Sequence, residues 1–181
     1  MQIISGKFAR RKLTAPTGAQ TRPTLARVKE SVFSIIQDKI QNAKVLDLFA
    51  GSGAYAAECA SRGAAEVILV DQSPEAAKAI AKNLKGMEYQ LVQLEVEHAL
   101  SRLKNQGKKF NLIFMDPPYN SDLGFLALRK IAHNNLLNED GIIIFETTGK
   151  NDLPKIPKSY IIVKDKSYGT ARVLILEQNN E

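Results

Sequence analysis

The stretch Asp47-Leu48-Phe49-Ala50-Gly51-Ser52-Gly53 decides the fold class, because it links a short apolar run to a segment of helix-forming residues. Glycines at such a junction let the chain turn sharply and leave free N–H groups at the start of the helix. In an open α/β sheet, ligands bind at this end of the strands. The stretch therefore predicts a strand, a ligand-facing turn and a helix.

Four further apolar runs follow, separated by longer helical patterns, over residues 66–71, 89–94, 111–116 and 141–146. Their centres are continuously apolar, as in strands that are buried on both faces. Ser73-Pro74-Glu75 marks one helix start, because Ser can cap, Pro fits the first turn and Glu complements the dipole. Strands separated by helices predict an α/β fold with a doubly wound, Rossmann-like sheet of about seven strands.

The C-terminal region breaks this alternation. Residues 159–165 and 171–177 are apolar runs on either side of a tight turn at Tyr168-Gly169. Two such runs around a glycine turn predict a hairpin. We expect the last strand to be antiparallel, and one antiparallel strand to close the edge of the sheet.

Upstream of the first strand, apolar residues at helical spacing predict an amphipathic helix over residues 24–39. Residues 3–8 and 11–16 have the character of short strands or of an extended arm. We predict a basic arm and docking helix over residues 1–42 and a body over residues 43–181. The length of 181 residues suits one compact domain.

The charge is concentrated at the N-terminus. The chain has a net charge of +6, but residues 1–44 hold nine basic and two acidic side chains, whereas the remainder holds sixteen and seventeen. The first 29 residues carry basic side chains and no acid: Lys7, Arg10, Arg11, Lys12, Arg22, Arg27 and Lys29. Clustered Lys and Arg without acids favour nucleic-acid binding.

Composition excludes several classes. At 44% hydrophobic and 24% charged residues the chain is an ordinary globular sequence. No apolar run approaches the roughly 20 residues that span a bilayer, and the N-terminus lacks the pattern of a signal peptide, so we expect a cytoplasmic protein. Cys59 is the single cysteine, which excludes intramolecular disulfides, and His98 and His133 lack metal-ligand spacing. We expect no metal.

The glycine turn by itself fits two cofactors. Gly51 to Ala56 matches the dinucleotide pattern, and Asp71 lies 20 residues after Gly51, where a ribose-binding carboxylate belongs. However, Asp47 lies where a pyrophosphate would be repelled. S-adenosylmethionine (SAM) instead brings an ammonium and a sulfonium to this end and a ribose diol to Asp71. The competing role of Asp71 is a helix cap.

A second motif, Asp116-Pro117-Pro118-Tyr119, follows another central strand. Two prolines fix the backbone and leave carbonyls as acceptors, the carboxylate adds another acceptor, and the aromatic ring can stack on a base. An exocyclic amine is a poor nucleophile, so both of its hydrogens must be accepted before nitrogen can attack a methyl donor. We assign Asp116 and the Pro117 carbonyl as acceptors and Tyr119 as the stacking residue. The competing interpretation is a rigid turn.

Both motifs resemble those of class I SAM-dependent methyltransferases. Asp-x-Phe-x-Gly-x-Gly resembles their motif I, and the tetrapeptide resembles the motif of amino methyltransferases. The resemblance implies a set of cofactor-binding residues: Asp47, Phe49, Ala50, Gly51, Ser52, Gly53, Asp71, Gln72 and Glu97. Glu97 departs from the pattern, because relatives usually carry Asp near the adenine. The tetrapeptide does not distinguish adenine N6, cytosine N4, guanine N2 and glutamine amide as targets.

The N-terminal region resembles the signature of the RsmD family, bacterial guanine-N2 methyltransferases of small-subunit ribosomal RNA. The similar segments are residues 3–13, 21–24 and 27–33, together with Glu146 at a strand end and Tyr168-Gly169 in the hairpin. The resemblance implies that the loop 22–24 and the following helix lie over the cofactor mouth. Together with charge, it implies RNA contacts for a set of residues: Lys7, Arg10, Arg11, Lys12, Arg22, Thr24 and Arg27.

The resulting hypothesis is SAM-dependent methylation of guanine N2 in 16S rRNA, within the assembling small subunit and without an obligate protein partner or membrane. Substrate context comes from the resemblance alone. The alternatives are an adenine-N6 or glutamine methyltransferase and a non-catalytic RNA-binding assembly factor. Against a DNA methyltransferase stands the lack of a recognition domain, and against a glutamine enzyme stands Asp at position 116.

Overall fold

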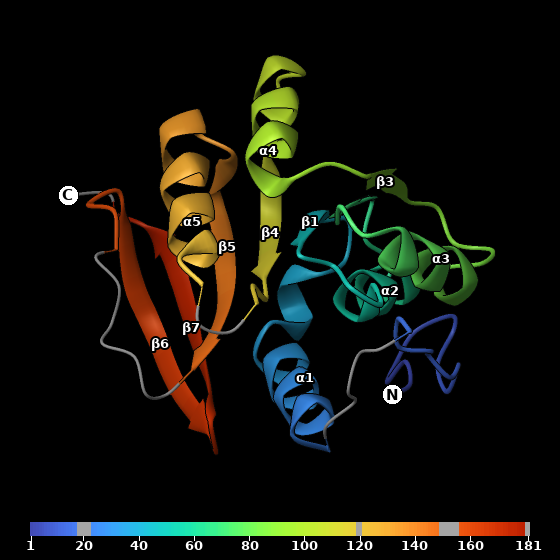
Figure 1. Ribbon diagram of the computed structural model, residues 1–181. Coiled ribbons are helices and arrows are strands. Elements are labelled where there is room, and N and C mark those ends of the chain that lie inside the picture. Colours follow the sequence, from blue (N-terminus) through green and yellow to red (C-terminus); the bar gives the residue numbers. More distant parts are fainter. Residues whose placement is uncertain (18–22, 119–120, 149–155, 180–181) are drawn as a thin grey trace.

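The computed structural model describes residues 1–17, 23–118, 121–148 and 156–179, with residues 23–25 described as backbone only. A seven-stranded sheet with the order β3-β2-β1-β4-β5-β7-β6 forms its centre (Figure 1). The strands are β1 Lys44–Leu48, β2 Glu66–Val70, β3 Gln90–Val92, β4 Phe110–Met115, β5 Leu137–Thr148, β6 Tyr160–Tyr168 and β7 Ala171–Gln178. The helices are α1 Pro23–Ile35, α2 Ala54–Ser61, α3 Pro74–Asn83, α4 Val96–Asn105 and α5 Leu123–Asn134, with a 3₁₀ turn at Gln37–Lys39.

The first five strands form the predicted doubly wound sheet. β1 pairs in parallel with β2 and with β4. β2 pairs in parallel with β3, and β4 with β5. All five carboxyl ends therefore lie along one edge, and both loops that carry the sequence motifs leave the sheet there.

The hairpin at the C-terminus and the antiparallel direction of its last strand are confirmed. β7 is antiparallel to both β5 and β6 and lies between them, so β6 forms the edge. The reason lies in the side chains. The centre of β7 is buried on both faces, whereas β6 leaves Ile161 and Val163 each 44% exposed and carries exposed lysines.

Helices cover both faces of the sheet and enclose two hydrophobic clusters. Side chains of α1, α2 and α3 pack against one face of the sheet, to which Val45, Leu112 and Ile144 point. The residues between them along each strand point to the other face. α4 and α5 pack together over that other face, against residues such as Leu46 and Ile113. Figure 1 shows α4 and α5 side by side and α1 beyond the lower end of β4.

The amphipathic helix is shorter than predicted. α1 ends at Ile35, and Ile36 leaves helical geometry with φ −103° and ψ 8° before the 3₁₀ turn. Val28, Val32 and Phe33 bury the apolar face of α1 against the sheet. The helix is thus part of the main core.

The N-terminal arm is a compact cap rather than a pair of strands. One isolated antiparallel bridge joins Gln2 and Lys12, and turns connect them. The arm lies on α2, where the backbone N–H of Lys7 donates to the Ser61 carbonyl at 2.8 Å. Gly6 is required there, because a Cβ at this position would lie 1.9 Å from the Ser61 carbonyl oxygen. In the described part of the chain, no helix is long and apolar enough to cross a membrane.

Candidate active site

The loop between β1 and α2 is held in a left-handed conformation at three positions. Gly51 and Gly53 have φ values of 54° and 70°, and Phe49, which is not a glycine, has 58°. A Cβ at Gly53 would lie 3.0 Å from side-chain carbons of Leu69 and Leu84. Strained non-glycine residues are typical of functional sites. The loop therefore needs both glycines and stores some strain at Phe49.

Two side chains fix the loop from outside. The carboxylate of Asp71 accepts the backbone N–H of Gly51 at 2.8 Å and that of Ser73 at 2.9 Å. The side-chain amide of Asn83 donates to the Ser52 carbonyl at 2.8 Å. The hydroxyl of Ser73 caps α3, as predicted. Asp71 is therefore a loop support and is not the helix cap.

Asp47 lies behind the loop and is buried. Its carboxylate accepts the backbone N–H of Ala56 at 3.1 Å. Burial raises its pKa to about 8, and the charge of Asp71 adds to the effect, although the bond from Ala56 opposes it. The sequence argument treated Asp47 as an ordinary carboxylate facing the ligand. The structure instead gives a side chain whose charge at neutral pH is costly and would be favoured by a nearby cation.

The Asp-Pro-Pro segment continues β4 at the same edge of the sheet. Asp116 and Pro117 are half-buried, and Pro118 is exposed. α5 comes very close to this segment, because a Cβ at Gly124 would lie 2.7 Å from Cγ of Pro117 and 2.8 Å from the Phe145 ring. Helix and loop thus hold each other in place. Tyr119, the predicted stacking residue, lies outside the described residues.

Asp116 is next to a second carboxylate, Glu146. The register between β4 and β5 pairs Met115 with Phe145, so the next residue on each strand is an acid. The hydroxyl of Tyr55 on α2 donates to Oε2 of Glu146 at 3.2 Å. This pair had not been predicted as a unit, because register between strands does not follow from their separate sequences.

Burial is the main cause that raises the pKa of each member of this group. The pKa of Asp116 lies well above its usual value because of burial and the charges of Glu146 and Asp47. Burial raises the pKa of Glu146, and the bond from Tyr55 opposes this. The pKa of Tyr55 is also raised by burial and by the carboxylates around it. Neighbouring buried carboxylates favour a shared proton over two charges.

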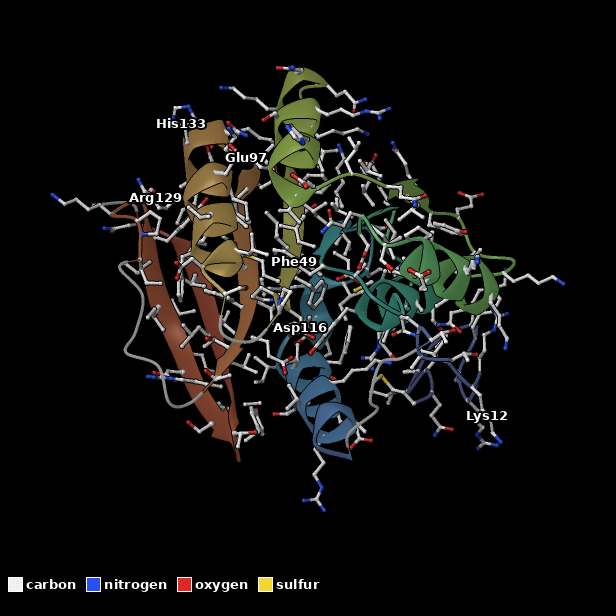
Figure 2. All side chains as sticks on the ribbon, in the orientation of Figure 1. Lys12, Phe49, Glu97, Asp116, Arg129 and His133 are labelled. Carbon is white, nitrogen blue, oxygen red and sulfur yellow. The ribbon has the colours of Figure 1, made fainter. Side chains whose placement is uncertain are left out.

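A cavity of about 1070 Å³ opens at this edge of the sheet. Phe49, Asp116, Arg129 and His133 all line it. Figure 2 shows Phe49 and Asp116 near the middle of the molecule and Arg129 and His133 along α5. The predicted site residues that line it are Phe49, Asp71, Gln72, Glu97, Asp116, Pro117 and Pro118. The structure therefore brings both sequence motifs to one cavity.

Other predicted residues do not line this cavity. In the motif I loop these are Asp47, Ala50, Gly51, Ser52 and Gly53. No described side chain of α1 lines it either, because the apolar face of α1 is packed against the sheet. Arg22 lies outside the described residues, and so does the side chain of Thr24. The exposed Arg27 is on α1 and away from the cavity lining.

The family of the chain follows from comparison with known proteins. A family model described as Conserved hypothetical protein 95 matches residues 1–177. The chain belongs to this family. YlbH of Bacillus subtilis (strain 168) is 35% identical over 182 residues, which cover 98% of this chain and 99% of that one. Ribosomal RNA small subunit methyltransferase D of Escherichia coli (strain K12) is 31% identical over 169 residues, or 93% and 85% of the two chains.

Solved structures agree. The structure of yhhF from Escherichia coli matches with a TM-score of 0.87 at 27% identity and covers 100% of this chain and 99% of that one. The fold is the one that class I methyltransferases share. These findings confirm the resemblance to the RsmD family that the N-terminal segments and the two motifs indicated.

The family member described here has a cavity wall that sequence reasoning missed. The additional lining residues are Ser73, Leu94, Glu95, Val96, Leu123, Leu126, Ala127, Arg129, Lys130 and His133. A signal existed on α5, since residues 123, 126, 127 and 130 share one helix face and two of them are leucines. Leu123 and Leu126 stay exposed. Part of this apolar stripe faces the cavity.

Charges at the far end of the cavity are partly paired. The Nζ of Lys130 lies 3.7 Å from the Glu97 carboxylate, and Nδ1 of His98 lies 3.8 Å from Glu95. Glu97 lines the cavity and His98 does not. Of these two side chains, Glu97 is therefore the one that a ligand in the cavity can meet.

The described basic residues of the arm, Lys7 to Lys12, do not line this cavity. Figure 2 shows Lys12 well apart from Asp116 and on the opposite side of the view from Arg129. Lys7, Arg10 and Lys12 are exposed. The arm thus forms a separate basic surface.

Arg11 differs from its neighbours in the arm, because it is half-buried and already bonded. Its guanidinium lies 4.3 Å from the Phe8 ring centroid and donates to the carbonyls of Lys85 at 2.6 Å and Asn83 at 3.3 Å. Arg11 therefore fastens the arm to the end of α3.

Proposed function

We propose that this protein transfers the methyl group of SAM to the N2 amine of a guanine in 16S rRNA of the small ribosomal subunit, in the cytoplasm. One observation carries the proposal. The Asp116-Pro117 segment and the Asp71 end of β2 line the same cavity, so a methyl donor and an amine acceptor can meet there. The Escherichia coli relative, ribosomal RNA small subunit methyltransferase D, supports the choice of RNA.

The residues of the cavity fit SAM. The two oxygens of a carboxylate can accept about four hydrogen bonds. Asp71 already accepts two from the backbone, so it can also accept hydrogen bonds from the two hydroxyls of a ribose. Gln72 and Glu97 supply polar groups and Val96 an apolar wall for the adenine. The buried Asp47 and the loop at residues 50–53 complete the proposed set, although the N–H groups of Ala50, Gly51 and Gly53 are already donated within the protein. SAM would supply an electrophilic methyl group on a sulfonium.

The acceptor side is proposed to work by positioning. The carboxylate of Asp116 and the carbonyl of Pro117 accept the two hydrogens of the amine, so that the nitrogen lone pair becomes available. Pro118 has no N–H and keeps the loop rigid. Tyr119 is proposed to stack on the target base. Such orientation and electrostatic support can account for most of the rate of an in-line methyl transfer.

RNA is proposed to contact a basic surface made of the arm and α1. Phosphate contacts come from exposed Lys and Arg, and give a salt-dependent affinity without sequence preference. The proposed residues are Lys7, Arg10, Lys12, Arg22, Thr24 and Arg27, and to a smaller degree Arg11, whose donors are partly used. Because Lys12 of the arm lies well apart from Asp116 (Figure 2), we propose that the substrate is a large particle, the assembling small subunit, that touches both.

The test is incubation with tritiated SAM of unmodified small subunits, naked rRNA, DNA and protein, followed by nucleoside analysis. The expected product is N2-methylguanosine in small subunits. Asp116→Ala should reduce it at least about 1000-fold. Asp122→Ala is the matched control, because Asp122 is exposed and makes no side-chain cap bond at the start of α5. Label in N6-methyladenosine, or full activity of the Asp116 variant, would contradict the proposal.

The cofactor has its own test. Calorimetry with S-adenosylhomocysteine and with NAD should show binding of the former alone. Preferential binding of NAD would reverse the assignment of the glycine turn.

A further inference from the structure

We propose that Glu146 is a specificity-determining residue, whose free oxygen Oε1 accepts the N1–H of the target guanine while Asp116 and Pro117 hold the adjacent N2 amine. The proposal rests on the proposed methylation of guanine N2 and adds the group that selects this base.

The two carboxylates face the same side of the sheet. Side chains alternate along a strand, and Phe114 and Ile144 both belong to the cluster under α1 and α2. Two residues further on along β5, Glu146 points to that same side. Asp116 directly follows β4, and the charges of both Glu146 and Asp116 act on Tyr55, which belongs to this side. Tyr55 on α2 reaches Glu146 from across the layer. A planar edge presented to Asp116 therefore meets Glu146 as its next neighbour.

One atom of Glu146 lacks a partner. Its side chain is 3% exposed, and Oε1 is the one buried side-chain oxygen or nitrogen without a hydrogen bond among the described residues. The other oxygen is fixed by the Tyr55 hydroxyl at 3.2 Å. Leaving a buried acceptor unsatisfied is costly, so such an atom in a folded protein indicates a ligand. Fixing Oε2 also fixes the direction of Oε1.

Guanine has the edge that this arrangement needs. Its N1–H and N2–H₂ donors lie side by side, so two neighbouring acceptors satisfy both. Adenine offers an acceptor, N1, beside its N6 amine, and that lone pair would face the Glu146 carboxyl. A site with acceptors in both positions thus favours guanine and disfavours adenine by repulsion.

The protonation of the pair is compatible with this role. The raised pKa values of Asp116 and Glu146 favour one shared proton, and a protonated carboxyl still has an acceptor oxygen. The groups around the pair are Tyr55 from α2, Asp47 from β1, the Phe33 ring stacked on Tyr55 from α1, and Val173 from β7 opposite Glu146. All of these are acidic, aromatic or apolar.

Glu146 is not among the residues that line the cavity, so the base must reach it from the strand ends. Asp116 is half-buried, and Thr147 and Thr148 after Glu146 are half-buried as well. The carboxyl pair therefore lies one residue inside the point where β5 reaches the surface.

The experiment compares two bases at the target position once tritium labelling has located it. The rRNA carries either guanine or 2-aminopurine there, since 2-aminopurine keeps the N2 amine but has no N1–H. The wild-type protein should prefer guanine by at least about 100-fold in kcat/KM, because an unmatched acceptor in a buried site is costly. Glu146→Met keeps the length of the side chain but removes its acceptor oxygens. It should reduce this preference below about tenfold, chiefly because methylation of guanine becomes slower.

Two variants control this comparison. Glu146→Gln retains a carbonyl oxygen and should keep most of the preference. Glu139→Met is the matched control, because Glu139 is exposed on the same strand, and should behave as wild type. If wild type methylates both bases equally, or if Glu146→Met keeps the full preference, the proposal is wrong. The wild-type result decides even if Glu146→Met fails to fold. An absence of N2-methylguanosine in the labelling step would instead contradict the proposed function.

Discussion

Two buried glutamates, Glu58 and Glu146, have the same chemistry and opposite environments. Glu58 is 0% exposed, yet its carboxylate accepts the backbone N–H of Ile4 at 2.8 Å and pairs with Lys29 at 2.9 Å and Arg62 at 2.8 Å. Burial would raise the pKa of Glu58, but these partners outweigh it and the pKa is lowered. Glu146 is 3% exposed, has one hydrogen bond from Tyr55, and its pKa is raised.

The difference separates a structural acid from a functional one. Glu58 joins the arm, α1 and α2, and all its acceptor capacity serves the fold. Glu146 lies near the carboxyl ends of the parallel strands, and its Oε1 has no hydrogen-bond partner among the described residues. Buried charges persist when they are paired, and an unpaired one is destabilising unless a ligand completes it.

The largest expected effect comes from breaking the structural acid. Glu58→Gln should lower the free energy of unfolding by about 3–5 kcal/mol, because it leaves Lys29 and Arg62 without their buried partner. The folded pKa of Glu58 is lowered, so its contribution is present above the unfolded pKa and is lost as the pH falls through the folded pKa. Urea unfolding of both proteins at pH 7 and pH 3 checks this. Equal stability at pH 7 would contradict it.

A smaller effect of opposite sign is expected at the cofactor loop. The folded pKa of Asp47 is about 8. Its contribution to stability is therefore fully present below the unfolded pKa and is lost as the pH rises from about 4 to 8. Asp47→Asn should stabilise the protein at pH 9 by on the order of a few kcal/mol and should change little at pH 4. Thermal unfolding across this range measures it.

The same variant should lose cofactor affinity, because it removes the carboxylate that we propose to attract the ammonium of SAM. Calorimetry with S-adenosylhomocysteine provides this second measurement. A variant that is neither more stable at high pH nor weaker in binding would mean that Asp47 is an ordinary core residue.

Glu146→Gln should have a still smaller effect on stability and should not destabilise. The raised pKa of Glu146 means that its carboxylate costs stability as the pH rises, so the amide should add about 1 kcal/mol near pH 8 and nothing below pH 4. Parallel unfolding of the Glu58 and Glu146 variants tests the comparison directly. Destabilisation of both by similar amounts would remove the distinction drawn here.

The smallest effect on the fold is expected at the exposed arm residues. Replacement of Arg10 and Lys12 by Glu should leave stability and cofactor affinity unchanged, because both side chains are exposed. Binding to small subunits should weaken. The slope of log K for binding against log salt concentration should become less steep by about two. The buried Lys29, 2% exposed and paired with Glu58, is the matched contrast, since its loss should affect stability instead. Filter binding at several salt concentrations distinguishes these outcomes.

Much of the fold followed from local pattern. Continuous apolar runs located the strands, and Ser73-Pro74-Glu75 located the start of α3, because burial on both faces and helix capping depend on neighbouring residues. The two motifs were placed correctly at strand ends. Which strand of the hairpin forms the edge was left open, although the continuous apolar centre of β7, compared with the charged β6, contained the signal.

The arm shows where composition misleads. Lys29 counted toward a basic cluster, but its position on the inner face of α1 buries it against Glu58. Arg11 belongs to the same cluster and serves partly as a fastener of the arm. Charge counted along a chain does not say which face of a helix or turn a side chain occupies.

The sequence by itself determined the parallel α/β sheet, the glycine turn after β1 and the Asp-Pro-Pro segment after β4, because each depends on residues close in the chain. Only the tertiary structure decided that Asp116 and Glu146 are neighbours, that Oε1 of Glu146 is unpaired, and that α5 walls the cavity. Those facts depend on strand register and helix packing between segments far apart in sequence. Burial then decides which carboxylates are paired and which await a ligand.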